Sequence, residues 1–321
     1  MGVALVGTVI RPARIDEIEE CGRLWRDALN DYLRPLNQAE VPDELGPIGR
    51  LHAHTQATDP ERFIVALRVV NGVDRILAFG SAVVRGAVPG GRAGRLWFLS
   101  MLFVRPEAQD EGLGRTLLER LMPSPRFDGA RVTVVDSLQP ISTALYSRYG
   151  IVPRMPLLNL AGELRPTTLP ELPKSVRAVA FGLQTPAESS GDLRASLDEL
   201  DAELLGVSHP EDHAFLANDG GRGFLYRGRE GVLGYGYATE RGRLGPVAAR
   251  DPALLAPIIR HLVAAVPPRG ASALWVPGDA GRLVRDLLEA GLRLEEFPLL
   301  MSWDQPFADF SRYVPISPGL L

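Results

Sequence analysis

The chain has 321 residues, of which 45% are hydrophobic and 23% charged, and a formal net charge of -4. This length predicts two domains, and this composition excludes a disordered chain. There is no basic run, so we expect no nucleic-acid partner. No secretory leader and no apolar run near the ~18 residues of a membrane span are present, so we expect a cytoplasmic protein with no membrane partner. The chain has only one cysteine, so we expect no intrachain disulfide.

The first half of the chain alternates helical and β patterns. Apolar residues recur at helical spacing from Ile15 to Leu29, and Asn71-Gly72 between two alternating apolar runs predicts a hairpin. The predicted elements, in order, are a strand ending near Arg11, a helix over 15–29, a helical stretch near 45–54, the hairpin, a strand over 96–105, a helix from Gly112, the strand ARVTVVDS, a helix stopped by Gly150 and the strand IVPRMPLLNL. This order indicates a mixed α/β domain over residues 1–162.

The second half repeats this plan. Residues 163–176 are rich in proline and have no apolar period, which predicts a linker. Over residues 177–302 follow a strand, an amphipathic helix, three strand-like runs, the helix ALLAPIIRHLVAAV, the strand ASALWVP, the helix RLVRDLLEAGL and a final strand. The tail, 303–321, is too rich in proline for a central strand and too aromatic for a free linker, so we expect it to pack on a domain surface. The two halves read as duplicated domains.

A glycine-containing turn joins a strand to a helix in the stretch SMLFVRPEAQDEGLGRTLLERL. Gly112 and Gly114 permit positive φ and let a ligand approach the backbone closely. The helix that begins there presents unpaired N–H groups and the positive end of its dipole, which favours a pyrophosphate. Gly114 is not followed by Lys and Ser or Thr, which excludes a Walker A loop, and Leu117 stands where a dinucleotide fingerprint needs its third glycine.

Two motifs stand at a suitable separation in this half: LFVRP at 102–106 with QDEGLG at 109–114, and LYSRYG at 145–150. They resemble the Leu-x-Val-x-Pro, Gln/Arg-x-x-Gly-x-Gly/Ala and Leu-Tyr-x-x-x-Gly motifs of the GNAT superfamily of acyl-CoA-dependent N-acyltransferases. The resemblance covers residues ~8–160 in order of elements as well. It implies an α/β fold of two tandem GNAT-like domains, each with a central mixed, mostly antiparallel sheet flanked by helices.

The resemblance also assigns roles to residues. Main-chain groups of the strand end would line the pantetheine and hold the thioester oxygen, the amides of the loop would hold the pyrophosphate of acetyl-CoA, and Tyr146 would protonate the leaving sulfur as general acid. The implied cofactor-binding residues are Leu102, Phe103, Val104, Gln109, Asp110, Glu111, Gly112, Leu113, Gly114 and Arg115.

The general base is less well defined. Many family members carry a glutamate on the strand before the loop, and the matching position here is Leu99, with no carboxylate on that strand. Asp136, at the end of the next strand, is the candidate substitute, acting directly or through water; the alternative is that it caps a turn or helix in DSLQP. Gln139 also departs from the asparagine that the family often has before the tyrosine.

The second half does not keep the motifs. Laid on the same pattern, the Gln/Arg position is Pro252, the glycine positions are Leu255 and Pro257, and the tyrosine position is Leu287. We expect a degenerate copy that keeps the fold, has lost CoA binding and completes the substrate pocket or braces the first domain.

Two histidines have a helical ligand spacing. His209 and His213 are four residues apart in SHPEDH, but Pro210 indicates the first turn of a helix with acidic capping, and the sequence shows no third ligand. His52 and His54 are two apart and would not share a helix face. We therefore expect no metal.

The leading functional prediction is an acetyl-CoA-dependent N-acetyltransferase that acts on the primary amine of a small molecule or peptide through one site in the first domain. The alternative is a non-catalytic acyl-CoA-binding regulatory module, because the strand lacks the usual carboxylate. O-acylation, a longer acyl donor and a homo-oligomer all remain open at the level of sequence.

Overall fold

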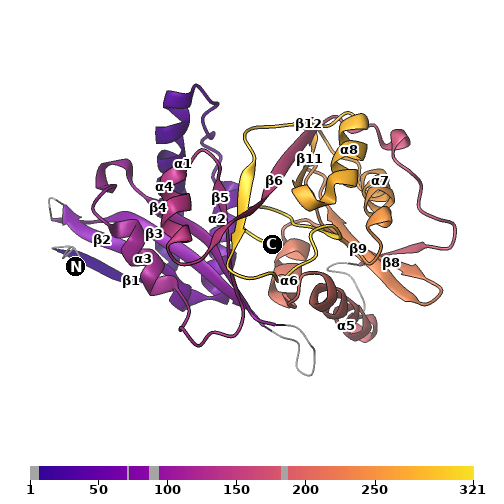
Figure 1. Cartoon of the computed structure of the whole chain (residues 1–321), viewed down its shortest axis with the longest axis horizontal. Helices are drawn as coiled ribbons and strands as arrows, with labels where there is room; N and C mark the ends of the chain where they lie inside the picture. Colours follow the sequence, from indigo (N-terminus) through magenta and orange to yellow (C-terminus); the bar gives the residue numbers. More distant parts are fainter. Residues whose placement is uncertain (1–6, 71, 87–93, 182–186) are drawn as a thin grey trace. The chain divides into compact units, whose positions relative to one another are not determined.

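The computed structural model describes residues 7–70, 72–86, 94–181 and 187–321 (Figure 1). By their contacts these residues form two units, the first within residues 1–84 and 97–127 and the second within 85–96 and 128–321. The boundaries expected from the sequence, at 162, 176 and 302, divide the chain by repeat rather than by contact, and they stay a prediction.

The first unit contains a strand group with the order β1-β2-β3-β4. Its elements are β1 (Thr8–Pro12), α1 (Ile18–Leu33), α2 (Gly46–Thr58), β2 (Phe63–Val70), β3 (Val73–Arg85), β4 (Leu96–Val104) and α3 (Leu113–Leu121). Strand β2 pairs antiparallel with β1 and with β3. The predicted hairpin is thus confirmed, although Asn71 in its turn lies outside the described residues.

Helix α1 explains how this unit builds its core. Its apolar residues recur at helical spacing, which puts Ile18, Cys21 and Leu24 on one buried face. They pack with Phe63 and Val65, two alternate residues of β2 that point to the same side of the strand.

The second unit contains the remaining elements. These are β5 (Ala130–Asp136), α4 (Pro140–Ser147), β6 (Val152–Gly162), β7 (Arg177–Phe181), α5 (Ala187–Leu204), α6 (Pro210–Asn218), β8 (Arg222–Gly228), β9 (Gly231–Ala238), β10 (Leu244–Ala249), α7 (Leu255–Ala265), β11 (Ser272–Pro277), α8 (Gly281–Glu289), β12 (Arg293–Leu294), β13 (Leu299–Trp303) and β14 (Tyr313–Val314). One group of strands has the order β5-β13-β6-β11, with β12 also on β6, and the other has the order β14-β10-β9-β8-β7.

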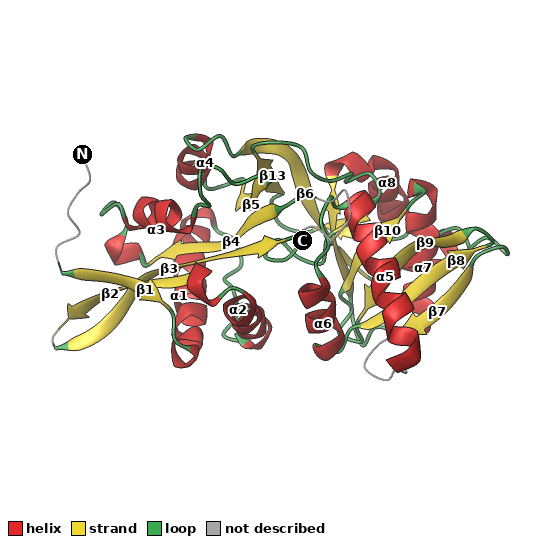
Figure 2. Cartoon of the chain, turned by 90° about the horizontal axis from the view of Figure 1, so that it is seen from below, coloured by secondary structure: helices red, strands yellow, loops and turns green. Residues whose placement is uncertain are grey.

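Strand β13 joins two strands of the first repeat. It pairs antiparallel with β5, where Leu300 faces Val135, and antiparallel with β6, where Leu300 faces Pro156 (Figure 2). The final strand of the second repeat therefore lies between two strands whose sequence belongs to the first. Strand β6 in turn pairs with β11 of the second repeat.

Strand β9 has the alternating sequence GYGY at 234–237, and helices α5 and α7 lie on its opposite faces. The hydroxyl of Tyr235 donates a hydrogen bond to Asp201 of α5. The next residue, Gly236, faces α7 so closely that a Cβ there would lie 2.9 Å from Leu262 Cδ1. Since successive residues of a strand point to opposite faces, α5 and α7 cover opposite sides of this sheet.

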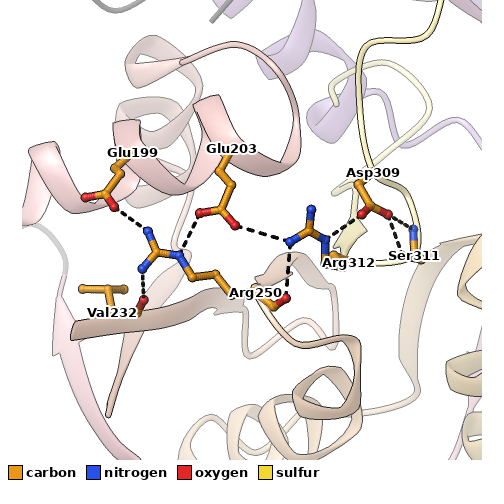
Figure 3. A network of polar contacts seen from close by, with 7 residues as sticks. All are labelled: Glu199, Glu203, Val232, Arg250, Asp309, Ser311 and Arg312. Carbon is orange, nitrogen blue, oxygen red and sulfur yellow. Dashed lines mark hydrogen bonds and ion pairs between the residues drawn. The ribbon is translucent and has the colours of Figure 1, made fainter. Parts of the chain in front are cut away.

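The tail adds a strand rather than lying only on a surface. Strand β14 pairs with β10 at the edge of its sheet, which suits a proline-rich segment, and Tyr313 is fully buried. Polar contacts hold the same region: Arg250 binds Glu199 and Glu203 of α5, while Arg312 binds Glu203 and Asp309 (Figure 3).

Candidate functional site

The turn between β4 and α3 has the backbone geometry that its sequence predicts. Pro106 ends the strand, and the backbone then turns through Asp110, with φ of 65°, and Gly112, with φ of 82°. Gly112 is the N-cap of α3 and has no side chain to accept from the first amides of the helix. An ideal Cβ on Gly112 would have no described heavy atom within 4 Å, so open space adjoins this helix end. The helix can thus offer its N–H groups to a ligand.

Ion pairs fasten this turn to the neighbouring strands. Glu111 pairs with Arg68 of β2, and Glu107 pairs with Arg75 of β3 at 2.6 Å. Gln109 donates a side-chain hydrogen bond of 3.4 Å to the carbonyl of Val104. These contacts hold the loop in place before any ligand binds, which reduces the ordering cost of binding.

The end of β4 differs from its beginning. Residues 96–99 are buried, whereas Leu102, Phe103 and Val104 are half-buried. Phe103 stacks on Phe79 with ring centroids 5.8 Å apart. The strand carries no carboxylate, so the acidic residue that the family often has there is missing.

The two predicted catalytic residues lie in the second unit. Tyr146 is on α4, its side chain is buried, and burial raises the pKa of its phenol above the ordinary value. The hydroxyl therefore stays protonated across the neutral range, as a general acid requires. Asp136 ends β5, and its Oδ1 accepts a hydrogen bond of 2.9 Å from the amide of Leu138. The carboxylate thus caps a turn, as the alternative reading of the sequence proposed, and its role as a base stays a prediction.

In the second repeat, the helix end that corresponds to the start of α3 is capped by a side chain of the chain itself. Asp251 accepts a hydrogen bond of 2.9 Å from the amide of Ala253, just before α7 begins at Leu255. Leu255 and Pro257, at the two glycine positions, are buried, and so is Leu287 at the tyrosine position. A carboxylate of the chain itself thus occupies the place where the first repeat has bare amides.

A second candidate site is a buried cluster of one aspartate and two histidines, which the sequence analysis did not predict. Asp201 of α5 lies with His209 and His213, and one ligand atom from each of the three lies within 4.8 Å of the others. Burial lowers the pKa of His209, but the charges and side-chain contacts of Asp201 and Asp212 together outweigh burial and raise this pKa to about 10. Asp201 is the third potential metal ligand that the spacing of the histidines could not reveal, because it comes from a different helix.

Comparisons with known proteins agree with these motifs. Residues 24–151 match the model of the acetyltransferase (GNAT) family. A protein from Pyrococcus horikoshii named as "A Putative Acetyltransferase" has the same fold at 15% identity, with a TM-score of 0.73 over 99% of this chain and 97% of its own. No curated protein matches the sequence significantly.

Two further structures share the fold along nearly the whole chain. A GCN5-related N-acetyltransferase from Sphaerobacter thermophilus is 15% identical, with a TM-score of 0.59 over 96% of this chain and 99% of its own. A tandem GNAT protein from the clavulanic acid biosynthesis pathway is 14% identical, with a TM-score of 0.52 over 93% and 99%. At 14–15% identity, this similarity shows a shared fold and nothing further about function.

The fold and the family match together define an acyltransferase of the N-acetyltransferase type. Residues 24–151 match the GNAT family, and the whole chain has the fold of two tandem GNAT-like domains, with mostly antiparallel sheets flanked by helices. Among the described residues, no helix is long and apolar enough to cross a membrane.

Proposed function

We propose that the chain is an acetyl-CoA-dependent N-acetyltransferase that acts on a primary amine of a small molecule or peptide. The observation that carries this proposal is the N-terminus of α3 after Gly112, which has no capping side chain. Open space adjoins it, and the half-buried end of β4 leads into the turn before it. Bare amides at a helix end suit the pyrophosphate of acetyl-CoA, and a half-buried strand end suits the pantetheine.

The reaction follows from the needs of acyl transfer. The neutral amine nitrogen attacks the thioester carbon, a main-chain amide of β4 stabilises the oxyanion, and the C–S bond breaks as the amide forms. Tyr146 gives its proton to the departing thiolate, a role that its buried, protonated phenol supports. The amine loses its proton to Asp136, directly or through water.

The first test is calorimetric titration of acetyl-CoA and of CoA into the full chain, followed by a turnover assay with a panel of amines. We expect one binding site per chain and acetylation of at least one amine. Tyr146→Phe should lower turnover by about 10²–10⁴-fold, because it removes the general acid, and should leave CoA affinity nearly unchanged. Absence of CoA binding would contradict the proposal.

A non-catalytic acyl-CoA-binding regulatory module is the second candidate. It is favoured by one observation: β4 has no carboxylate, and Asp136 already caps a turn. Such a module would bind CoA with the same stoichiometry, and neither the wild type nor Tyr146→Phe would turn over any amine in the panel. The turnover assay therefore separates the two candidates, while the binding assay tests the site that they share.

The second repeat has no CoA site in this proposal. Asp251 and the buried residues at the glycine positions support it, because a carboxylate at this helix end repels a phosphate. Saturation with two CoA molecules per chain would contradict it. Asp251→Ala should leave CoA binding unchanged.

A further inference from the structure

Three buried side chains of the second unit form the cluster Asp201–His209–His213. Asp201 comes from α5, His209 precedes the first residue of α6, and His213 lies in the first turn of α6. Their exposed fractions are 0%, 1% and 7%. Ionisable groups this deep in a protein need partners, since each loses its hydration on folding.

The donor atoms of this cluster converge on one carboxylate oxygen. Asp201 Oδ2 lies 2.8 Å from His213 Nε2 and 3.3 Å from His209 Nε2. The two imidazole rings stack with centroids 4.7 Å apart, so both rings approach the oxygen from the same side. Ligands at about 2.0–2.1 Å from a tetrahedral zinc ion stand ~3.3 Å apart. The two distances to Asp201 Oδ2 are within about half an ångström of this value, and all three donors lie within 4.8 Å of one another.

His209 is the least satisfied member. Within the described part of the chain, its two ring nitrogens have carboxylate oxygens at 3.3 and 3.6 Å but make no well-aligned hydrogen bond, although the side chain is almost fully buried. Buried polar atoms without partners are rare in folded proteins and point to a missing ligand or ion. The unbonded Nε2 is the atom that faces Asp201.

The outer atoms of all three side chains face buried partners. Tyr235 donates a hydrogen bond of 2.6 Å to Asp201 Oδ1, and Tyr237 shares one of 2.8 Å with His213 Nδ1. Metal-binding histidines commonly use their second nitrogen in this way, which fixes the ring and leaves the other nitrogen for the ion.

His209 has the corresponding carboxylate. Its Nδ1 lies 3.6 Å from Asp212 Oδ2, and Arg85 holds both oxygens of Asp212 through hydrogen bonds of 2.9 and 2.7 Å. Around zinc sites, a carboxylate commonly contacts one nitrogen of a histidine while the other nitrogen of the same ring binds the metal. Arg85 balances the charge of Asp212, so Asp201 is left as the buried carboxylate that faces the two imidazoles.

We propose that Asp201, His209 and His213 bind one divalent transition-metal ion, with zinc as the best chemical match. Two imidazoles and one carboxylate suit zinc and its neighbours, whereas calcium and magnesium prefer oxygen donors alone. The three donors leave the fourth position of a tetrahedral ion to water. The ion joins α5 to α6 and so stabilises the second unit, independently of CoA binding in the first.

The test is metal content. The full chain is expressed with added zinc, desalted and analysed by mass spectrometry; a second sample is unfolded with chelator and refolded with Co²⁺ or without metal. We expect about one metal per chain, visible cobalt absorption of a four-coordinate site and a higher melting temperature with metal than without. Less than about a tenth of a metal per chain in both preparations, with equal melting temperatures, would overturn the proposal and leave a metal-free network with protonated His209.

Variants separate this site from adventitious binding. His209→Gln and His213→Gln should reduce bound metal at least ~tenfold, and Tyr237→Phe, which removes only an outer hydrogen bond, should weaken affinity by about 10–100-fold. His261→Gln is the matched control, because His261 lies in the same unit and bonds Tyr226. Equal metal content in wild type, His209→Gln and His213→Gln would refute the assignment. Should these variants fail to fold, the wild-type cobalt spectrum still decides it.

Discussion

Gly112 combines two properties that a substitution can separate. Its φ of 82° favours glycine, and the space beside it is open. Asparagine and aspartate tolerate such a φ similarly well and have nearly the same shape, but only aspartate adds a negative charge. We predict that Gly112→Asp binds CoA at least ~tenfold more weakly than Gly112→Asn, because the carboxylate repels the pyrophosphate.

Calorimetry on the two variants measures this difference. Gly220→Asp is the control for backbone strain, since Gly220 has the same φ of 82° and open space but lies outside any CoA motif. Equal CoA affinity of Gly112→Asp and Gly112→Asn would mean that no phosphate lies at this helix end.

His52 gives the first unit an acid-sensitive core. Its ring makes edge contacts with Phe63 and Phe79, with centroids 5.7 and 5.2 Å away, and burial lowers its pKa to about 3. The unfolded chain therefore binds more protons below the ordinary pKa of about 6.5. The stabilisation that follows is complete above that pH and falls by about 1.4 kcal/mol per pH unit as the pH drops toward the folded pKa.

We predict that His52→Leu removes much of this loss. Urea unfolding at pH 7 and pH 5 should show a smaller difference between the two pH values for His52→Leu than for the wild type. His54→Leu, two residues away and partly exposed, is the control and should keep the wild-type difference. An unchanged pH dependence in His52→Leu would show that other groups dominate.

At the residue scale, the sequence predicted local features and missed a distant one. The loop of Gly112 could be predicted because strand, turn and helix are consecutive and each has its own signal. The turn-capping role of Asp136 was one of two readings, and the structure shows the cap. Asp201 had no signal, because its partnership with His209 and His213 depends on how α5 packs beside α6, and no spacing in the sequence records that.

The end of α5 meets the tail at Gly206. Its φ is +79°, and an ideal Cβ there would lie 2.2 Å from the carbonyl oxygen of Phe307. An added methyl group must therefore displace the backbone before β14. We predict that Gly206→Ala lowers the free energy of unfolding by about 1–3 kcal/mol more than Gly220→Ala, which pays only for its φ. Urea unfolding measures both, and equal losses would contradict the predicted clash.

Most elements were predictable from their patterns, and their partners were not. The helices and strands from Thr8 to Gly162 occur in the expected order, because each carries its own periodicity and breakers. The tail was recognised as neither linker nor central strand, yet its pairing with β10 follows from complementary sheet edges rather than from composition. Buried Leu164 and Leu169 likewise pack in the core around α7, although their proline-rich surroundings read as a linker.

At the scale of the whole molecule, β13 makes the two repeats interdependent. Residues 1–162 contain the entire stretch that matches the family model, but they lack the strand that pairs with both β5 and β6. We predict that a chain ending at residue 162 does not unfold cooperatively on heating, because β5 and β6 then have unpaired edges facing each other. Circular dichroism on this fragment and on the full chain measures the difference; a sharp transition in the fragment would contradict it.

The position of β13 also sets the order of events during synthesis. Strands β5 and β6 leave the ribosome before residues 163–298, and at ~5–20 residues per second their partner follows on the order of ten seconds later. During that interval the nascent chain carries two strands without the one that joins them, and such edges attract wrong partners. The domain that is made first therefore receives its last strand only near the end of synthesis, and a chaperone that shields it has its widest opportunity while the second repeat is being translated.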